Sequence, residues 1–368
     1  MKPKSVLNGL PVYQPGKPLE EVKRELGLSE VIKLASNENP FGCSPRIWES
    51  LQEEAAQTAL YPEGSAPELR EKLSSHLGVD PEKILFGNGA DEVIQMIARA
   101  FMEPGVEAVL GDRTFPRYQT QIVIEGGEPV EVPLKEGVHD LDAMAQAVTD
   151  RTRIVWICNP NNPSGTIITQ EQLEAFLAKL PEHVMVVMDE AYFEYVDDPA
   201  YPDTLSLLEQ DPRLVVLRTF SKIYGLAAFR IGYCVASESI ITELNKVREP
   251  FNANRIAQRA ARAALEDQEF VDHCRKANQA GREQIQKQLE EWGLSSYPSQ
   301  ANFVLVDTGR PADEVFQCLL QKGVIVRSGE ALGYPTHLRV TVGDEKQNRR
   351  FLETLAVCLD KPLKEQRG

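Results

Sequence analysis

Residues 214–230 read Leu-Val-Val-Leu-Arg-Thr-Phe-Ser-Lys-Ile-Tyr-Gly-Leu-Ala-Ala-Phe-Arg, an apolar run followed by hydroxyls, a lysine, a glycine and an arginine. The run at residues 214–217 predicts a buried strand, and Gly225 lets the backbone turn after it. Lys222 is a candidate nucleophile, because a lysine in a crevice beside Arg230 loses solvation and its pKa falls. Read alone, a lysine at this place is more often a solvated surface residue.

A second strand end favours the functional interpretation of Lys222 over that of a solvated surface residue. Residues 184–188 form a continuous apolar run that ends in Asp189, with Tyr192 three residues later. An acid there either caps the next segment or faces a cationic ligand. A lysine suits an aldehyde, a carboxylate suits a pyridinium nitrogen, and Thr219, Ser221 and Arg230 suit a phosphate. Together these groups describe a site for pyridoxal phosphate.

The fold class follows from the alternation of apolar strands with loops and helices between residues 84 and 236. We expect strands at residues 84–86, 107–110, 130–132, 154–158, 184–188, 214–217 and 231–235. This alternation predicts an α/β fold with a doubly wound, mostly parallel, seven-stranded sheet, in which ligands bind beyond the carboxyl ends of the strands.

Domain organisation follows from a change of character near residue 245. Long helical patterns and a few late strands come after it and predict a smaller α+β domain. We therefore expect a large cofactor-binding domain at residues 34–245 and a small C-terminal domain at 246–368. Residues 1–33 are punctuated by Pro and Gly and predict an N-terminal arm that associates with the small domain or with a partner subunit.

Composition excludes several classes of partner. The 368-residue chain has 40 basic and 55 acidic residues, a formal net charge of -15, which disfavours nucleic acid and anionic membranes. No apolar run of about 18 residues and no export signal occur, so we expect no membrane span. The six cysteines lack Cys-x-x-Cys spacing and predict reduced thiols and a cytoplasmic location. The five histidines lack metal-ligand spacing, so no metal is expected.

Separated motifs give the chain a resemblance to a known family. Asn162-Pro163-Ser164-Gly165, Asp189-x-x-Tyr192, Ser221-Lys222 and Arg230 occur in the order and spacing of the fold-type I, pyridoxal-phosphate-dependent aminotransferases. Residues 13–18 and 34–40, with Arg327 and Arg339, resemble the histidinol-phosphate aminotransferases among them. The resemblance covers the chain to about residue 355.

The resemblance implies a role for each motif residue. Lys222 would bond to the cofactor aldehyde and move the reacting proton, Asp189 would hold the ring nitrogen, and Phe115 would stack on the ring. Tyr192 and Asn162 would hold the phenolic oxygen. The cofactor phosphate would be held by Gly89, Ala90, Asp91, Thr219, Ser221 and Arg230, with Tyr61 reaching it from the neighbouring subunit. The substrate would be bound by Tyr13, Asn37, Asn162, Arg327 and Arg339.

The resemblance also implies a homodimer with shared active sites. Its expected reaction is exchange of an amino group between L-histidinol phosphate and 2-oxoglutarate in histidine biosynthesis. The same fold leaves two alternatives open, an aromatic amino acid aminotransferase and a threonine-phosphate decarboxylase. A catalytically silent pyridoxal-phosphate-binding regulator would be expected to have lost Lys222 or Asp189 and to carry an appended domain, and neither is seen.

The turn at residues 87–91, Gly-Asn-Gly-Ala-Asp, can be interpreted without the family. Its small residues precede an expected helix, so free N–H groups and the helix dipole can face an anion. A plainer interpretation is a tight turn with Asp91 as the helix N-cap. The turn also partly matches a dinucleotide-binding fingerprint, but Glu92 stands where the third glycine is needed, which disfavours a nicotinamide dehydrogenase.

Overall fold

The computed structural model describes residues 2–10 and 19–362, and its largest element is a seven-stranded sheet in the order β2-β8-β7-β6-β5-β3-β4. Neighbouring strands are parallel except at β8, which runs antiparallel to β2 and β7. All seven expected strands are present. They are β2 (Ile84–Gly87), β3 (Glu107–Gly111), β4 (Glu128–Val132), β5 (Thr152–Cys158), β6 (Met185–Asp189), β7 (Leu214–Thr219) and β8 (Gly232–Ala236).

Helices cover both faces of this sheet because its central strands are apolar on both sides. In β6, Val186 and Met188 belong to one core cluster, whereas Met185 and Val187 belong to the other. Burying one such side chain contributes about 1.5–3 kcal/mol. One face packs on α4 (Ala90–Phe101), α5 (Arg117–Ile124) and α9 (Glu238–Val247). The other packs on α3 (Pro67–Leu77), α6 (Leu141–Gln146), α7 (Gln170–Leu177), α8 (Thr204–Leu208) and α10 (Arg255–Leu265), with α2 (Arg46–Glu54) beside α10.

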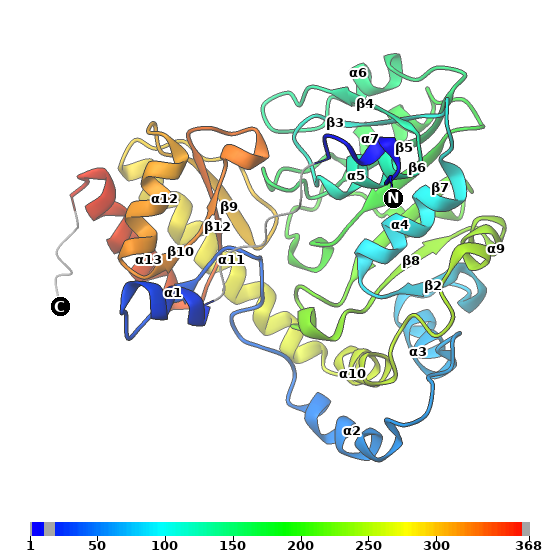
Figure 1. Cartoon of the computed structure of the whole chain (residues 1–368), viewed down its shortest axis with the longest axis horizontal. Coiled ribbons are helices and arrows are strands. Elements are labelled where there is room, and N and C mark those ends of the chain that lie inside the picture. The colour runs from blue at the N-terminus through cyan, green and yellow to red at the C-terminus, as the bar shows by residue number, and fades with distance from the viewer. Residues whose placement is uncertain (1, 11–18, 363–368) are drawn as a thin grey trace.

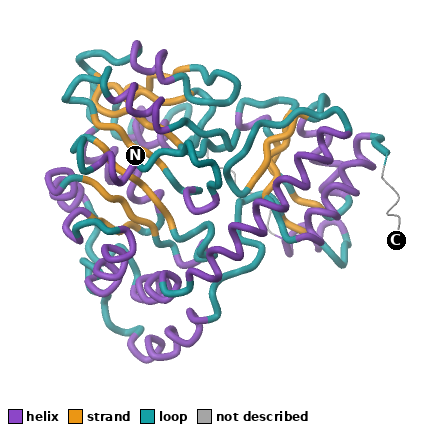
Figure 2. Tube along the Cα trace, turned by 180° about the vertical axis from the view of Figure 1, so that it is seen from behind, coloured by secondary structure: helices purple, strands orange, loops and turns teal. Residues whose placement is uncertain are grey.

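A second, smaller lobe contains the late strands (Figures 1 and 2). Strands β11 (Arg327–Ser328), β12 (His337–Thr341) and β9 (Phe303–Asp307) form an antiparallel sheet, and β1 (Ile32–Lys33) pairs in parallel with β10 (Val324–Ile325). Helices α1 (Leu19–Leu26), α12 (Ala312–Gln321) and α13 (Glu345–Leu359) lie in this lobe, and the long α11 (Gln268–Glu291) leads into it. Single 3-10 turns occur at Ser5–Leu7, Ala55–Gln57, Pro81–Lys83, Phe193–Tyr195, Ala227–Phe229 and Glu330–Leu332.

The boundary near residue 245 stays a prediction. The buried alanines of α10 belong to the core cluster that lies under the large sheet, although the sequence suggested grouping this helix with the small domain. Residues 32 and 33, at the end of the expected N-terminal arm, form β1 and add a strand to the smaller lobe.

The start of α4 has no side-chain cap, in contrast to several other helices of the described chain. Asp140, Thr169, Asn254, Asp267 and Asp344 cap their helices through side-chain oxygens. The N-cap of α4 is Gly89, which has no side chain, so the first N–H groups of this helix stay available to another acceptor. The plainer interpretation of Asp91 as the N-cap is therefore wrong, because Asp91 lies one residue inside the helix.

The expectation of six reduced cysteines is wrong for one pair. Cys318 on α12 and Cys358 on α13 form a disulfide across two helices that pack together. Cysteine spacing along the chain could not reveal this pair, because the two residues are 40 positions apart and meet only through tertiary packing. Cys43, Cys158, Cys234 and Cys274 are not bonded.

None of the helices in residues 2–10 and 19–362 combines the length and apolar character that crossing a membrane requires.

Candidate active site

A cavity of about 500 Å³ lies beyond the carboxyl ends of β5, β6 and β7, between the large sheet and the β11–β12 strands. This is the edge at which the sequence predicted ligand binding. Most predicted site residues contribute to its wall: Asn37, Ala90, Asp91, Phe115, Asn162, Asp189, Tyr192, Thr219, Ser221, Lys222, Arg230, Arg327 and Arg339.

Lys222 follows β7 and reaches into this cavity. Its Nζ lies 3.4 Å from the carbonyl oxygen of Ser36 and 5.7 Å from the ring centroid of Tyr192. Burial lowers the pKa of Lys222 to about 8, and the charge of Arg339 lowers it further than that of Arg230 does. The sequence pointed to Arg230 as the neighbouring cation, whereas the fold places Arg339 as the stronger influence. Above pH 8 the amine is largely neutral and can act as a nucleophile or a base.

Asp189 is the last residue of β6 and is only 4% exposed. Its Oδ2 accepts a hydrogen bond from Tyr118 Oη at 2.5 Å, and its Oδ1 accepts one from the Ala191 N–H at 3.1 Å. Burial raises the pKa of Asp189 to about 6, although these two hydrogen bonds oppose the rise. Both partners are neutral, so the buried carboxylate lacks the cation that would offset its desolvation in these two contacts. A pyridinium N–H fits this requirement.

Tyr118 is the functional neighbour that sequence reasoning missed. It projects from α5, stacks on Trp156 with ring centroids 4.8 Å apart, and meets the edge of Phe115 at 5.6 Å. Its ring is fully buried, and burial raises the pKa of its phenol, so the hydroxyl stays protonated and donates to Asp189. The available signal was the three-residue spacing of Phe115 and Tyr118 at the start of a helix.

The other end of the cavity forms a cradle for an anion. Gly89 has φ +78°, and a Cβ built on it would lie 2.5 Å from Nη2 of Arg230, so glycine lets the guanidinium close over the turn. Arg230 Nη1 lies 3.4 Å from Ser221 Oγ, and Thr219 Oγ1 accepts from the Ser221 N–H at 3.1 Å. Guanidinium, hydroxyls and the uncapped N–H groups of α4 form a donor set suited to a phosphate.

A buried polar network connects the two sides of the cavity. Tyr192 Oη accepts from Nδ2 of Asn37 at 2.9 Å and from Nδ2 of Asn162 at 3.2 Å. Arg339 Nη1 donates to Asn162 Oδ1 at 2.6 Å, and its Nη2 donates to the Ala35 carbonyl at 2.8 Å. The network fixes Asn162 and Tyr192 relative to the guanidinium, because the Asn162 amide donates to Tyr192 and accepts from Arg339.

The remaining predicted residues fall into three cases. Arg327 lies opposite Arg339 in the register of the antiparallel pair β11–β12, so both arginines face one end of the cavity. Tyr61 is not in the cavity wall of its own chain; it is 78% exposed and stacks on Phe251 at 4.7 Å. Tyr13 lies outside the described residues.

Comparisons with known proteins identify the family of the chain. Residues 29–355 match the family model for aminotransferase class I and II. The chain is 55% identical over 364 residues to a histidinol-phosphate aminotransferase of Brevibacillus brevis, covering 99% of this chain and 100% of the relative. It is 53% identical over 359 residues to the enzyme of that name from Geobacillus sp., covering 98% of each chain.

A solved structure shares the fold over nearly the whole chain. It is the histidinol-phosphate aminotransferase of Sinorhizobium meliloti in complex with pyridoxal-5'-phosphate. The two align with a TM-score of 0.89 and 29% sequence identity, covering 97% of each chain.

Proposed function

This chain belongs to the class I and II aminotransferase family, and from that premise we propose a role for each active-site residue. It is a pyridoxal-phosphate-dependent aminotransferase that exchanges the amino group between L-histidinol phosphate and 2-oxoglutarate in histidine biosynthesis. The observation that carries the residue assignment is the placement of Lys222 and Asp189 in one cavity, between an anion cradle and an arginine pair.

The residues present fit the cofactor. The buried Asp189 carboxylate would pair with the ring nitrogen, and the cradle around Gly89 and Arg230 would hold the phosphate. Phe115 would pack on the ring, while Tyr192 and Asn162 would hold the phenolic oxygen. When bound, pyridoxal phosphate supplies an electron sink for the charge that develops at the substrate Cα.

The protein groups then perform binding and proton transfer. Lys222, with its pKa lowered to about 8, would take the proton from the substrate Cα as a neutral amine and, as an ammonium, would donate it to C4′ of the cofactor. Asp189 keeps the ring nitrogen protonated because its carboxylate is an acceptor held in place by Tyr118. Arg339 and Arg327 accept the substrate anion, which is a phosphate in one half-reaction and a carboxylate in the other.

The substrate is tested by comparing amino donors. With 2-oxoglutarate as acceptor, histidinol phosphate should give a higher kcat/KM than phenylalanine. A preference for phenylalanine would replace the proposal with an aromatic aminotransferase. Release of carbon dioxide from O-phosphothreonine, without glutamate formation, would replace it with a threonine-phosphate decarboxylase.

We also propose a homodimer in which Tyr61 completes the active site of the partner copy. The ring of Tyr61 is exposed and outside its own cavity, and it stacks on Phe251, which is itself 46% exposed. Leu60 and Trp48 are also exposed, at 62% and 58%. Large exposed apolar side chains that lie next to one another, as Leu60, Tyr61 and Phe251 do, favour a protein interface. A cytoplasmic location is proposed from the metabolic role rather than from the cysteines, since one pair is bonded.

A further inference from the structure

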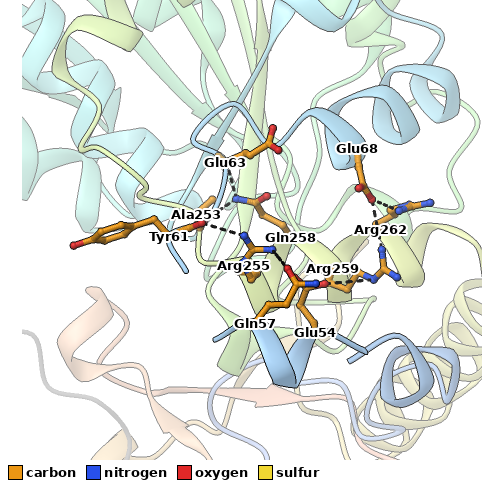
Figure 3. Close-up of polar contacts among 10 residues, drawn as sticks. All are labelled: Glu54, Gln57, Tyr61, Glu63, Glu68, Ala253, Arg255, Gln258, Arg259 and Arg262. Carbon is orange, nitrogen blue, oxygen red and sulfur yellow. Dashed lines mark hydrogen bonds and ion pairs between the residues drawn. The ribbon is translucent and has the colours of Figure 1, made fainter. Parts of the chain in front are cut away.

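The segment that carries Tyr61 is held by side chains rather than by regular structure (Figure 3). Residues 58–66 contain no helix or strand, so their carbonyl groups need other donors. Arg255 Nη2 donates to the Tyr61 carbonyl at 3.0 Å, and Gln258 Nε2 donates to the Glu63 carbonyl at 3.1 Å. From outside α10, Arg248 Nη1 donates to the Gly64 carbonyl at 2.7 Å. Three donors thus fix the backbone on both sides of Pro62.

Arg255 is itself fixed from the other side. Its Nη1 lies 2.7 Å from Oε1 of Glu54, a carboxylate of α2 with only 12% of its side chain exposed, and 3.3 Å from Oε1 of Gln57. The guanidinium therefore joins the end of α2 to the carbonyl of Tyr61. A hollow of about 280 Å³ lies beside this contact, and Glu54, Gln57, Arg255 and Gln258 contribute to its wall.

Arg262, on the same helix, makes a different contact. It pairs with Glu68 of α3, which lies beyond the segment, and no hydrogen bond from it to residues 58–66 is present. Arg255 and Arg262 therefore share a helix and a type of ion pair, but only Arg255 contacts the backbone of Tyr61. This difference provides a matched control.

The held segment presents the Tyr61 ring outward. Figure 3 shows the ring extending away from the arginines, with its hydroxyl at the far end. Phe251 stacks against the ring at an interplanar angle of 20°. Next to Phe251, Asn252 Nδ2 donates to the Phe86 carbonyl at 3.0 Å and to Glu92 Oε2 at 2.7 Å. Arg255 holds the Tyr61 backbone, and the side chain of Asn252 holds the residue next to Phe251, which leaves the Tyr61 hydroxyl available to another chain.

We propose that Arg255, assisted by Gln258, is a positioning residue that holds Tyr61 in place for the active site of a second copy of this chain. The inference rests on the proposed shared-site homodimer and extends it to a residue that touches neither cofactor nor substrate. Arg255 acts through the carbonyl of Tyr61, so its loss misplaces a hydroxyl in the partner's site and leaves its own cavity intact.

The first experiment measures cofactor affinity. Pyridoxal phosphate is titrated into apoenzyme and the dissociation constant is obtained from absorbance, with sedimentation and thermal unfolding to verify a folded dimer. Arg255→Met should weaken binding about five- to fiftyfold, because one fixed hydrogen bond and its orientation are lost. Gln258→Met provides a second variant without loss of charge and should weaken binding in the same direction. Arg262→Met should bind like wild type. Equal losses in Arg255→Met and Arg262→Met, or no loss in Arg255→Met, would overturn the proposal.

The second experiment asks in which subunit Arg255 acts. Mixed dimers of Arg255→Met and Lys222→Ala subunits contain one site with an intact Lys222 and an intact Tyr61 segment from the other chain. That site should show wild-type KM and wild-type affinity in borohydride trapping of the cofactor on Lys222. A site that stays impaired would place the effect of Arg255 within its own subunit and overturn the inference.

A parallel mixture separates this inference from the proposed function. Tyr61→Phe subunits mixed with Lys222→Ala subunits should also recover one wild-type site. If this mixture fails, the shared-site dimer is wrong; if it succeeds and the Arg255→Met mixture fails, only the positioning role is wrong. Combining Tyr61→Ala with Arg255→Met in one chain should weaken binding no more than Tyr61→Ala alone, because both changes remove the same contact.

Discussion

The hydroxyl of Tyr118 lies 2.5 Å from Oδ2 of Asp189, so the carboxylate assigned to the cofactor ring is oriented by a buried phenol 71 residues away in the chain. This hydrogen bond lowers the pKa of Asp189 against the rise that burial causes. Stacking of Tyr118 on Trp156 holds the phenol in place. The orientation of the ring-nitrogen partner therefore depends on two strands, β5 and β6, and on helix α5, rather than on Asp189 alone.

Tyr118→Phe should weaken the binding of pyridoxal phosphate. It should also raise the pH below which cofactor affinity is lost. Asp189 must be ionised to hold the ring nitrogen, and losing a hydrogen bond that stabilises the carboxylate raises its pKa further above about 6. A hydrogen bond to a charged group contributes about 1.5–3 kcal/mol, which corresponds to roughly ten- to a hundredfold in affinity. Cofactor affinity of the apoenzyme, measured from pH 5 to pH 8, checks this. An unchanged pH profile would show that Tyr118 only fills space.

What the sequence could predict depends on how local each signal is. Lys222 and Asp189 were found because apolar strands identify their own carboxyl ends, and parallel strands bring those ends together. Tyr118 was missed because nothing near it in the sequence shows that its hydroxyl faces Asp189. The larger effect of Arg339 on Lys222 was missed for the same reason, since Arg339 extends from β12 of the smaller lobe to Asn162, which is far from it in the sequence. The Cys318–Cys358 pair likewise exists only through the packing of α12 on α13.

Asp189→Asn should retain the cofactor but lose most activity. The amide has the shape of the carboxylate, so its oxygen can still accept from the Ala191 N–H, but it has no charge to keep the ring nitrogen protonated. We expect a loss of at least about a hundredfold in kcat, on the order of 3 kcal/mol of transition-state stabilisation. Steady-state turnover with histidinol phosphate measures this, with cofactor content determined in parallel. Turnover near that of wild type would remove Asp189 from the proposed mechanism.

Arg339→Gln should raise the pKa of Lys222 above its value of about 8. Arg339 is the charged neighbour that lowers this pKa most, so its loss favours the protonated amine. Because only the neutral amine attacks an aldehyde, covalent attachment of pyridoxal phosphate at pH 8 should slow, and its pH dependence should move upward. Borohydride trapping followed by mass spectrometry of the peptide containing residue 222 gives the rate. Arg327→Gln is the control, because it removes another positive charge from the wall of the same cavity. An equal shift in both variants would point to a general loss of positive charge.

Thiol titration should count four reactive cysteines in the denatured, unreduced protein and six after reduction. Cys318 and Cys358 are the bonded pair, and Cys43, Cys158, Cys234 and Cys274 supply the four. The bond closes a loop across 40 positions, so Cys318→Ser should lower the free energy of unfolding by roughly 2–4 kcal/mol. Urea unfolding measures this, with Cys43→Ser as the unbonded control. Six thiols before reduction would restore the expectation drawn from the sequence.

Arg327→Ala should lower kcat/KM for histidinol phosphate about ten- to a hundredfold and should lower kcat/KM for glutamate by less. Arg339 is 9% exposed and fixed by Asn162 and Ala35, so it presents a preorganised guanidinium that suffices for a carboxylate. A phosphate is bulkier and carries more charge, and it calls for a second donor, which Arg327 supplies from the opposite strand at the same register. Charge-assisted contacts of this kind contribute about 1.5–3 kcal/mol each. Separate kcat/KM values for the two donors give the comparison. Equal losses would make Arg327 a general anion-binding residue, and a larger loss for glutamate would reverse the two roles.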